Sequence, residues 1–246
     1  MAISKILILG NGPELRRVLS VLEADPEKEC VGCVSWKVSD PSNEAIDPSL
    51  GMHFWRGTAE TLQELIAAQS AKIAIAISSA QERWKALSLL NSLSIVPEIL
   101  ISEGASVDDS AIIGAGSVIH QGVILEEGVS VGHGCLLLPG SRMGVGSRCG
   151  DACIMESGSQ VEDMGRLGDE VHLGTRTVVL SERIVGPGSL ILPGSIVTSD
   201  VESGVIVSGT PASAEARTAP SSSRGSRRRS RARTRHPSSA SRTLLD

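Results

Sequence analysis

The sequence of 246 residues predicts three parts: an α/β unit over residues 1–102, a prism of short parallel strands over 103–212, and a disordered tail over 213–246. Three observations predict this division. Apolar segments of strand type and helix type alternate through the first hundred residues. An aliphatic or sulfur-bearing residue then recurs at every sixth position. The final segment is rich in Arg and Ser and has almost no apolar side chains.

The first hundred residues contain four short apolar segments and three amphipathic segments in alternation. The expected strands are 5–10, 29–36, 72–78 and 96–101, and the expected helices are 13–23, 58–69 and 79–93. Strands that alternate with helices are typical of a parallel sheet whose helices pack against its faces. The sequence therefore predicts a small Rossmann-like α/β unit.

The turn after the first strand has the sequence Gly10-Asn11-Gly12, at the point where a phosphate-binding turn would lie. The dinucleotide fingerprint is incomplete, because Leu15 occupies the place of its third glycine and no acidic residue follows Ser35 at the end of the second strand. A nicotinamide cofactor is therefore not expected. Two interpretations remain: a pocket for a nucleotide or nucleotide sugar, or glycines needed only for tight packing of the strand against the helix.

The next hundred residues carry the six-residue repeat without interruption. Its members are Val107, Ile113, Ile119, Leu125, Val131, Leu137, Met143, Cys149, Met155, Val161, Leu167, Leu173, Val179, Val185, Ile191 and Val197. Since 41% of all residues are hydrophobic, the chance of such a run is on the order of one in a million. A period of six indicates a chain that turns after each short strand and directs one large side chain inward per side. We attribute the glycines that frequently follow the inward residue to the backbone angles of tight corners.

This pattern resembles the hexapeptide repeat of the left-handed parallel β-helix, in which three hexapeptides form one triangular coil of about 18 residues. The resemblance implies roughly five coils over residues 107–201. The low aromatic content, 2% of the chain, agrees with a narrow prism, which stacks Ile, Leu and Val more readily than rings.

The tail carries nine Arg against Glu215 and Asp246, although the net charge of the whole chain is −5. This composition predicts disorder. A basic tail can bind nucleic acid or anionic lipid, but no aromatic residue or folded module accompanies it, so specific nucleic-acid binding is not expected. No apolar run approaches the roughly 18 residues of a membrane span. The N-terminal residues lack a signal-peptide cleavage region, and a cytoplasmic protein is expected.

Metal binding is not expected. Cys30 and Cys33 have the spacing of a redox or metal pair, but they lie in a predicted strand without a second pair, which favours a packing role. The spacing of His120, His133 and His172 does not match a set of ligands gathered at one site.

An α/β unit that begins KILILGNG and runs directly into an unbroken prism resembles the sugar O-/N-acyltransferase family, typified by the sialic acid O-acetyltransferase and the bacillosamine N-acetyltransferase. The segment Gly209-Thr210-Pro211-Ala212 matches the closing Gly-x-Pro-Ala turn of that family. The resemblance covers about residues 3–216. It implies an acetyltransferase that uses acetyl-CoA to modify a nucleotide-linked amino sugar in polysaccharide or glycan biosynthesis.

The resemblance also implies where ligands bind. Acetyl-CoA lies along the prism between neighbouring subunits of a homotrimer, and the nucleotide of the acceptor lies on the N-terminal domain. The implied acetyl-CoA contacts are His172, Gly174, Gly209, Pro211 and Ala212. The implied nucleotide-sugar contacts are Gly10, Asn11, Gly12 and Ser35.

The sequence departs from the family at the catalytic base. Asp163 fills the place of the family's histidine, while His172, nine residues on, matches a second family position that faces acetyl-CoA. A carboxylate of ordinary pKa, about 4, is a weak base for an amine. It could serve if burial raised its pKa, or it could orient an amine that is already neutral. His133 holds the same place in its own hexapeptide and is the second candidate, while His120 is expected at the surface.

Two functions therefore remain. The first is the acetyltransferase, with N-acetylation more compatible than O-acetylation with the missing histidine, because a neutral amine attacks thioesters more readily than a hydroxyl. The second is a non-catalytic trimeric scaffold or regulatory relative that kept the prism and lost the base. The prism after Asp163 is also roughly one coil shorter than is usual in the family.

Overall fold

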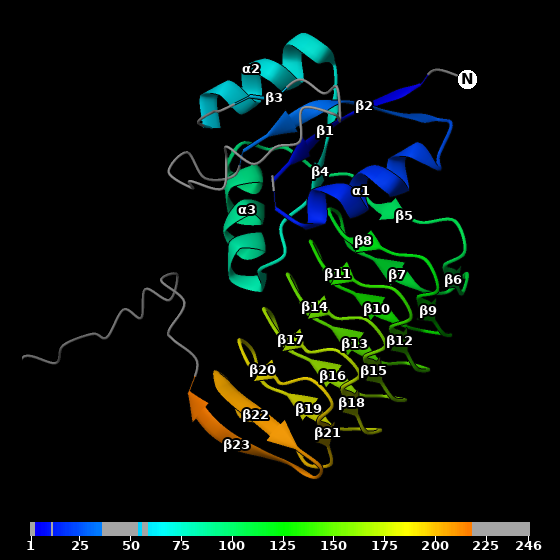
Figure 1. Cartoon of the computed structure of the whole chain (residues 1–246), viewed down its shortest axis with the longest axis vertical. Helices are drawn as coiled ribbons and strands as arrows, with labels where there is room; N and C mark the ends of the chain where they lie inside the picture. The colour runs from blue at the N-terminus through cyan, green and yellow to red at the C-terminus, as the bar shows by residue number, and fades with distance from the viewer. Residues whose placement is uncertain (1–2, 11, 36–53, 56–58, 218–246) are drawn as a thin grey trace, which may run out of the picture.

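The computed structural model describes residues 3–10, 12–35, 54–55 and 59–217. Figure 1 shows two parts stacked along the long axis, with the α/β unit above and a tapering series of coils below. The predicted α/β unit and left-handed β-helix are both confirmed, and the β-helix has about six coils rather than five. No helix in these ranges is both long enough and apolar enough to span a membrane.

The α/β unit contains one parallel sheet with the strand order β3-β2-β1-β4. Its elements are β1 (Ser4–Leu9), α1 (Glu14–Glu23), β2 (Lys28–Val34), β3 (Phe54–Trp55), α2 (Ala59–Gln69), β4 (Lys72–Ile75) and α3 (Ala80–Ser92). The three predicted helices and the first three predicted strands are thus confirmed within a few residues. Because β1 lies between β2 and β4, the connections leave the sheet in opposite directions on either side of β1.

The predicted strand over 96–101 is wrong. Only Leu100–Ile101 forms a strand (β5), and it pairs with a strand of the prism rather than with the α/β sheet. The preceding residues cross between the two parts, because the Glu98 N–H donates to the Ile73 carbonyl while the Pro97 carbonyl accepts from the Gly116 N–H. The α/β sheet gains its fourth strand from β3 instead.

The prism has three flat sides, each a parallel sheet of two-residue strands. The β5 sheet contains β5, β8 (Val118–Ile119), β11 (Leu136–Leu137), β14 (Ile154–Met155), β17 (His172–Leu173) and β20 (Leu190–Ile191). The β6 sheet contains β6 (Ser106–Val107), β9 (Ile124–Leu125), β12 (Arg142–Met143), β15 (Gln160–Val161), β18 (Val178–Val179) and β21 (Ile196–Val197). The β7 sheet contains β7 (Ile112–Ile113), β10 (Ser130–Val131), β13 (Arg148–Cys149), β16 (Arg166–Leu167) and β19 (Ile184–Val185).

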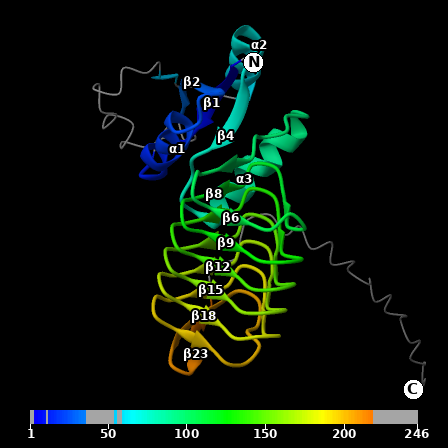
Figure 2. The same cartoon turned by 90° about the vertical axis from the view of Figure 1, so that its right-hand side faces the viewer.

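Residues eighteen apart lie directly above one another, as the pairing of Leu137 with Ile119 and Met155 shows. Figure 2 shows the resulting stack of coils. In each coil, the first corner follows the β5 sheet, the second follows the β6 sheet and the third follows the β7 sheet; in one coil these are residues 120–123, 126–129 and 132–135. The inward residues of the repeat form one continuous core from Ile119 to Val197.

The glycines that follow the inward residues are required by the close stacking of the coils, not by the backbone angles of the corners. Gly114 and Gly132 follow inward residues but are not in the left-handed region. A Cβ added to either would lie within about 2.5 Å of the backbone of the next coil, so close stacking excludes a side chain there. The left-handed residues lie two positions further on, where Met164 and Glu182 adopt φ of 60° and 64° without being glycine.

The prism ends in a hairpin. The strand β22 (Val205–Gly209) extends the β5 sheet, and β23 (Ala212–Arg217) pairs antiparallel with it. The Thr210–Pro211 peptide bond in the connecting turn is cis. Residues 213–217, which the sequence assigned to a disordered tail, therefore belong to a strand.

The α/β unit packs against the outer face of the β5 sheet. Leu15 and Val18 of α1 share one apolar core with Val118, Leu136 and Ile154, whose side chains point away from the interior of the prism. These outward positions are fully or almost fully buried. The contact explains why the upper part of this side of the prism is apolar on both faces.

Replacing buried serines at the corners is expected to separate those that satisfy backbone groups from those that do not. The Ser117 hydroxyl donates to the Gly132 carbonyl (2.8 Å) and accepts from the Cys135 N–H (2.9 Å), whereas the equally buried Ser147 hydroxyl makes no hydrogen bond. Ser117→Ala should lower the free energy of unfolding by about 1–3 kcal/mol, because a buried donor and acceptor lose their partner. Ser147→Ala should be neutral or stabilising in the same urea titration, and equal losses for both variants would contradict this assignment.

Candidate functional site

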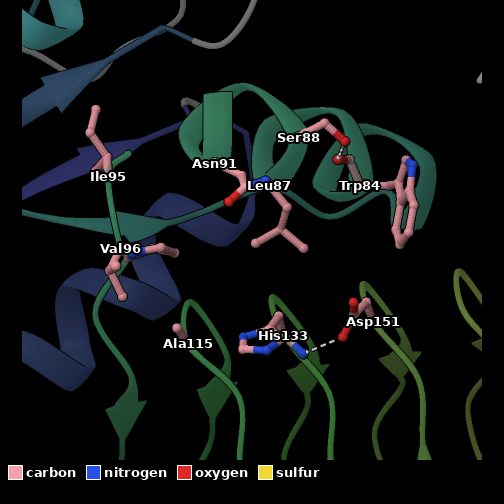
Figure 3. Close-up of a pocket in the computed structure, with 10 residues that line it drawn as sticks. Trp84, Leu87, Ser88, Asn91, Ile95, Val96, Ala115, His133 and Asp151 are labelled. Atoms are coloured by element: carbon pink, nitrogen blue, oxygen red, sulfur yellow. Dashed lines mark hydrogen bonds between the residues drawn. The ribbon is translucent and has the colours of Figure 1, made fainter. Parts of the chain in front are cut away.

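A cavity of about 430 Å³ opens between helix α3 and the third corner of the upper coils (Figure 3). Its lining comprises Trp84, Leu87, Ser88, Asn91, Ile95, Val96, Pro97, Ala115, His133 and Asp151. His133, one of the two candidate bases, lies on the prism side of this cavity below Leu87. The carboxylate of Asp151 accepts a hydrogen bond from the backbone N–H of His133 at 2.7 Å and does not engage the imidazole ring.

Aspartates at the corners tie each coil to the one before it. Asp151 accepts from the His133 N–H, and Asp169 accepts from the Asp151 N–H at 3.0 Å. Asp163, the other candidate base, makes the same kind of contact at the second corner, where its Oδ1 accepts from the Val145 N–H at 3.1 Å. One oxygen of the Asp163 carboxylate therefore has a structural partner, while the side chain is otherwise exposed.

His172 belongs to a hydrogen-bonded group on the outer surface of the prism. Its Nε2 lies 3.0 Å from Oε1 of Glu156, which belongs to the first corner of the preceding coil. The Thr175 hydroxyl donates to the other carboxylate oxygen at 2.7 Å. Partial burial raises the pKa of Glu156, but the hydrogen bonds from Thr175 and His172 outweigh it, so the pKa lies below its usual range.

The structure brings the predicted acetyl-CoA residues to one edge of the prism. Gly174 follows His172 at the first corner, where a Cβ would lie 2.7 Å from the backbone nitrogen of Pro193 in the next coil. Gly209 lies at the same edge in the last coil, and its N–H donates to the Ser195 hydroxyl at 3.2 Å. Pro211 and Ala212 form the end of the hairpin turn and the start of β23.

Three of the predicted nucleotide-sugar residues, Gly10, Gly12 and Ser35, lie at the carboxyl ends of β1 and β2. The Gly10 N–H donates to the Val34 carbonyl, and Ser35 is buried next to it. A Cβ on Gly10 would lie 2.1 Å from the Ala76 carbonyl oxygen, so strand packing alone requires this glycine. Nothing lies within 4 Å of a Cβ built on Gly12, so packing does not explain that position. Asn11 lies outside the described residues.

His120 is buried, which contradicts its expected place at the surface. Its Nε2 lies 2.8 Å from Oε1 of Glu14, whose carboxylate is fully buried, and Arg17 pairs with the other oxygen at 2.9 Å. Glu14 belongs to the first turn of α1, so this contact joins the α/β unit to the prism. The corner position of His120 correctly indicated a turn, but docking of α1 covers that turn.

Arg83 is the other contact that the sequence analysis missed. It is fully buried in α3, and its guanidinium donates to backbone carbonyls at the end of β4 and at the third corner. These are the carbonyls of Ile75, Ile77, Gly116, Gly134 and Cys135. Burial lowers the pKa of Arg83 to about 10, which leaves the group charged at neutral pH.

The cysteines do not form a reactive pair. Burial raises the pKa of Cys33 to about 12 and also raises that of Cys30, in agreement with a packing role. Cys135, Cys149 and Cys153 gather inside the prism with their sulfur atoms within 4.8 Å of one another. All three are sealed in the core, and Cys135 and Cys153 donate to the carbonyls of Gly150 and Gly168. This cluster is therefore separate from the exposed surfaces described above.

No protein-family model matches the chain. A 44-residue segment, 18% of this chain, is 46% identical to 2,3,4,5-tetrahydropyridine-2,6-dicarboxylate N-acetyltransferase from Clostridium perfringens. The corresponding enzyme from Staphylococcus aureus is also 46% identical over 44 residues. The chain thus matches only about a fifth of the length of these curated relatives, 19% and 18% respectively.

Solved structures match over far more of the chain. PerB from Caulobacter crescentus, solved in complex with CoA and GDP-perosamine, has a TM-score of 0.77 at 20% identity and covers 87% of this chain and 98% of its own. The acetyltransferase domain of PglB from Neisseria gonorrhoeae has a TM-score of 0.76 at 21% identity, with coverages of 86% and 99%. WeeI from Acinetobacter baumannii reaches 0.72 at 20% identity, with coverages of 87% and 100%. The chain therefore shares the fold of these three proteins over almost all of the residues that the structure describes.

Replacing Arg83 is expected to uncouple the two parts of the molecule. Arg83→Met leaves several buried carbonyls without donors, and each lost hydrogen bond to a charged group is worth about 1.5–3 kcal/mol. We expect a drop of at least about 3 kcal/mol in the free energy of unfolding, measured by urea titration, with the α/β unit unfolding before the prism. Lys85→Met on the same helix removes only an exposed pair with Glu82 and should change stability by less than about 0.5 kcal/mol. A single unchanged transition in Arg83→Met would contradict the role of this contact.

Proposed function

We propose that this protein is an acetyl-CoA-dependent acetyltransferase that acts on the amino group of an amino sugar linked to a nucleotide. The observation that carries this proposal is the fold similarity over both parts of the molecule at once. Hexapeptide prisms alone support many functions, and fold by itself does not define function. Here the match covers 87% of the chain, and so extends over both parts, for PerB, which was solved with CoA and GDP-perosamine, and for the acetyltransferase domain of PglB, which was solved with acetyl coenzyme A.

The edge that carries His172, Gly174 and Gly209 is the proposed acetyl-CoA groove. It runs down the first corner to the closing hairpin, where Pro211 and Ala212 would contact the far end of the CoA molecule. A long, flexible ligand suits an edge of this kind, because backbone groups are regularly spaced along it. The polar group of His172, Glu156 and Thr175 would then lie beside the thioester.

The proposed acceptor site is the edge of the α/β sheet at Gly10, Asn11, Gly12 and Ser35. Open parallel sheets bind ligands outside the carboxyl ends of their strands, at the point where the strand order reverses, which here lies between β1 and β4. The helices α1 and α3 both begin at this edge, and helix N-termini favour phosphate groups. Because the Glu14 carboxylate turns to His120, it does not fill the space next to Gly12.

Acetyl-CoA binding tests the proposal directly. Calorimetry should show binding to the wild-type protein, and His172→Ala should weaken it at least several-fold, because the imidazole lines the proposed groove. Acetyl-CoA should also raise the melting temperature, since a ligand that binds only the native state stabilises it. Glu98→Gln is the control, because Glu98 is about as exposed as His172 but pairs with Lys72, away from the proposed groove. This variant should bind acetyl-CoA as the wild type does. A wild-type protein that does not bind at millimolar concentration would leave the non-catalytic scaffold as the better account.

We also propose that three copies assemble around the prism. The second corner presents exposed apolar side chains on three consecutive coils: Val145, Met164 and Leu180, which are 43%, 48% and 39% exposed. This corner lies opposite the β5 sheet in the triangular section, so within one chain Asp163 and His172 are on opposite sides. In a closed ring, one surface of each copy meets a different surface of the next. The second corner of one copy would thereby bring Asp163 towards the groove of its neighbour.

Met164→Asp is expected to dissociate this assembly. Asp tolerates the left-handed backbone at this position better than most residues, so the fold should survive, while the new charge cannot be buried against a second copy. Light scattering should then give the mass of one chain instead of three. Ile3→Asp, at an even more exposed apolar residue on the α/β unit, should leave the mass unchanged. A wild-type protein that is already monomeric would refute the trimer.

A further inference from the structure

His172, Glu156 and Thr175 form a hydrogen-bonded group in which the imidazole of His172 is held in one orientation, as a general base requires. Both oxygens of the Glu156 carboxylate are engaged, one by His172 at 3.0 Å and the other by Thr175 at 2.7 Å, so the carboxylate has little freedom to rotate. The side chains of His172 and Glu156 are 28% and 34% exposed. The group is therefore sheltered enough to be ordered and open enough to meet a ligand.

The pairing determines which ring nitrogen can act. An ionised carboxylate can only accept hydrogen bonds, so Nε2 of His172 must carry the hydrogen that points at Glu156. In the neutral ring, Nδ1 then holds the lone pair. A carboxylate that fixes the tautomer and stabilises the imidazolium is the arrangement that makes histidine an effective proton acceptor in hydrolytic triads.

The other described histidines lack this combination. His120 is paired with Glu14, but it is only 4% exposed and no substrate reaches it. His133 lies in the cavity under α3, where Asp151 binds its backbone and not its ring. In the described part of the chain, His172 is thus the only histidine that combines a carboxylate partner on its ring with an accessible surface.

The location of His172 also favours a role in catalysis. The outward positions above it on the β5 sheet, Leu136 and Ile154, are buried in the core shared with the α/β unit. His172 is the next outward residue on the same face, directly below Ile154, and its side chain is partly exposed. It therefore lies at the lower boundary of the surface that the α/β unit covers. An acceptor held by the α/β unit and a thioester held along the first corner would approach each other at this boundary.

We propose that His172, oriented by Glu156, is the general base that takes the proton from the acceptor amine, in place of the histidine that is absent at position 163. This inference rests on the proposed function. The neutral amine attacks the thioester carbonyl carbon and forms the C–N bond, and Nδ1 of His172 takes one N–H proton. The tetrahedral intermediate then collapses, the C–S bond breaks, and the imidazolium returns the proton to the departing thiolate as free CoA. Glu156 is a positioning residue, because it acts only through His172.

The tautomer of His172 tests the inference without any substrate. Nitrogen NMR of ¹⁵N-histidine-labelled protein, with the signal assigned through His172→Ala, should show the hydrogen on Nε2 near neutral pH. In Glu156→Gln, the side-chain amide can donate to Nε2 and should increase the population with the hydrogen on Nδ1. A wild-type ring with its hydrogen on Nδ1 would overturn the inference, whatever the protein catalyses.

Turnover gives the second test, with acetyl-CoA and GDP-perosamine as the probe and CoA release as the signal. His172→Ala should lower kcat by about 100-fold or more, as is typical for loss of a general base, and should remove the acidic limb of the pH profile. Glu156→Gln should lower kcat at least 10-fold and change KM for acetyl-CoA less than threefold, because Glu156 orients the base without contacting the cofactor. Glu98→Gln is the matched control and should change none of these values.

The outcomes separate this inference from the proposed function. If the wild type turns over and His172→Ala retains its kcat within threefold together with the acidic limb, the base is elsewhere and the function stands. If the wild type binds acetyl-CoA but releases no CoA with GDP-perosamine, the general-base role of His172 is refuted, while the proposed acetyl-CoA groove is retained. If acetyl-CoA does not bind at all, both fall together.

Discussion

The guanidinium of Arg83 is the constraint on which the arrangement of the two parts depends. A charge in a fully buried position must be solvated by the protein itself, and here backbone carbonyls from β4 and from two consecutive third corners provide that solvation. These carbonyls converge only if α3 lies against the corners at one height and one angle. The same contact therefore sets the cavity around His133 and holds the α/β unit over the β5 sheet.

The contact between Glu14 and His120 acts with Arg83 from the other side. Arg83 fastens α3 to the third corner, whereas Glu14 fastens α1 to the first corner, and the apolar core between α1 and the β5 sheet lies between them. Two polar attachments at opposite edges of one apolar contact resist rotation as well as separation. If the acceptor binds to the α/β unit and acetyl-CoA binds to the prism, the two parts must be held rigidly for the ligands to react. Misplacement of the reacting atoms by about 1 Å can lower the rate by orders of magnitude.

The sequence predicted the prism well because its determinants are local. One inward residue per hexapeptide is a property of the repeat itself, so Val131 or Leu173 could be placed without knowing the rest of the fold. The sequence could not predict which sheet Leu100–Ile101 would join. Its pairing with β8 instead of the α/β sheet depends on long-range contacts such as the hydrogen bond from the Gly116 N–H to the Pro97 carbonyl. The two-residue strand β3 is too short to leave a periodic signal.

The candidate site was predicted in part. His172 and Gly174 were expected from the family resemblance. Glu156 was missed even though the repeat carried a signal for it, since in a coil of 18 residues Glu156 stacks directly on Gly174 and lies diagonally from His172. The burial of His120 had no such signal, because it depends on where α1 docks. The prediction that Asp163 and His133 supply the base has not been tested, and their places at separate corners give it no support within one chain.

The repeat also determines how a molecule of this kind can change in length. Each coil contacts only the coils before and after it, while the α/β unit is fastened to the uppermost coils and the hairpin β22–β23 closes the lowest. Stability in such an array is close to a sum over neighbouring layers. A whole coil of 18 residues could thus be gained or lost from the middle without disturbing either end. Each coil gained or lost would therefore change the distance between the acceptor site and the closing hairpin by one fixed step. Proteins with this fold could in this way fit ligands of different length.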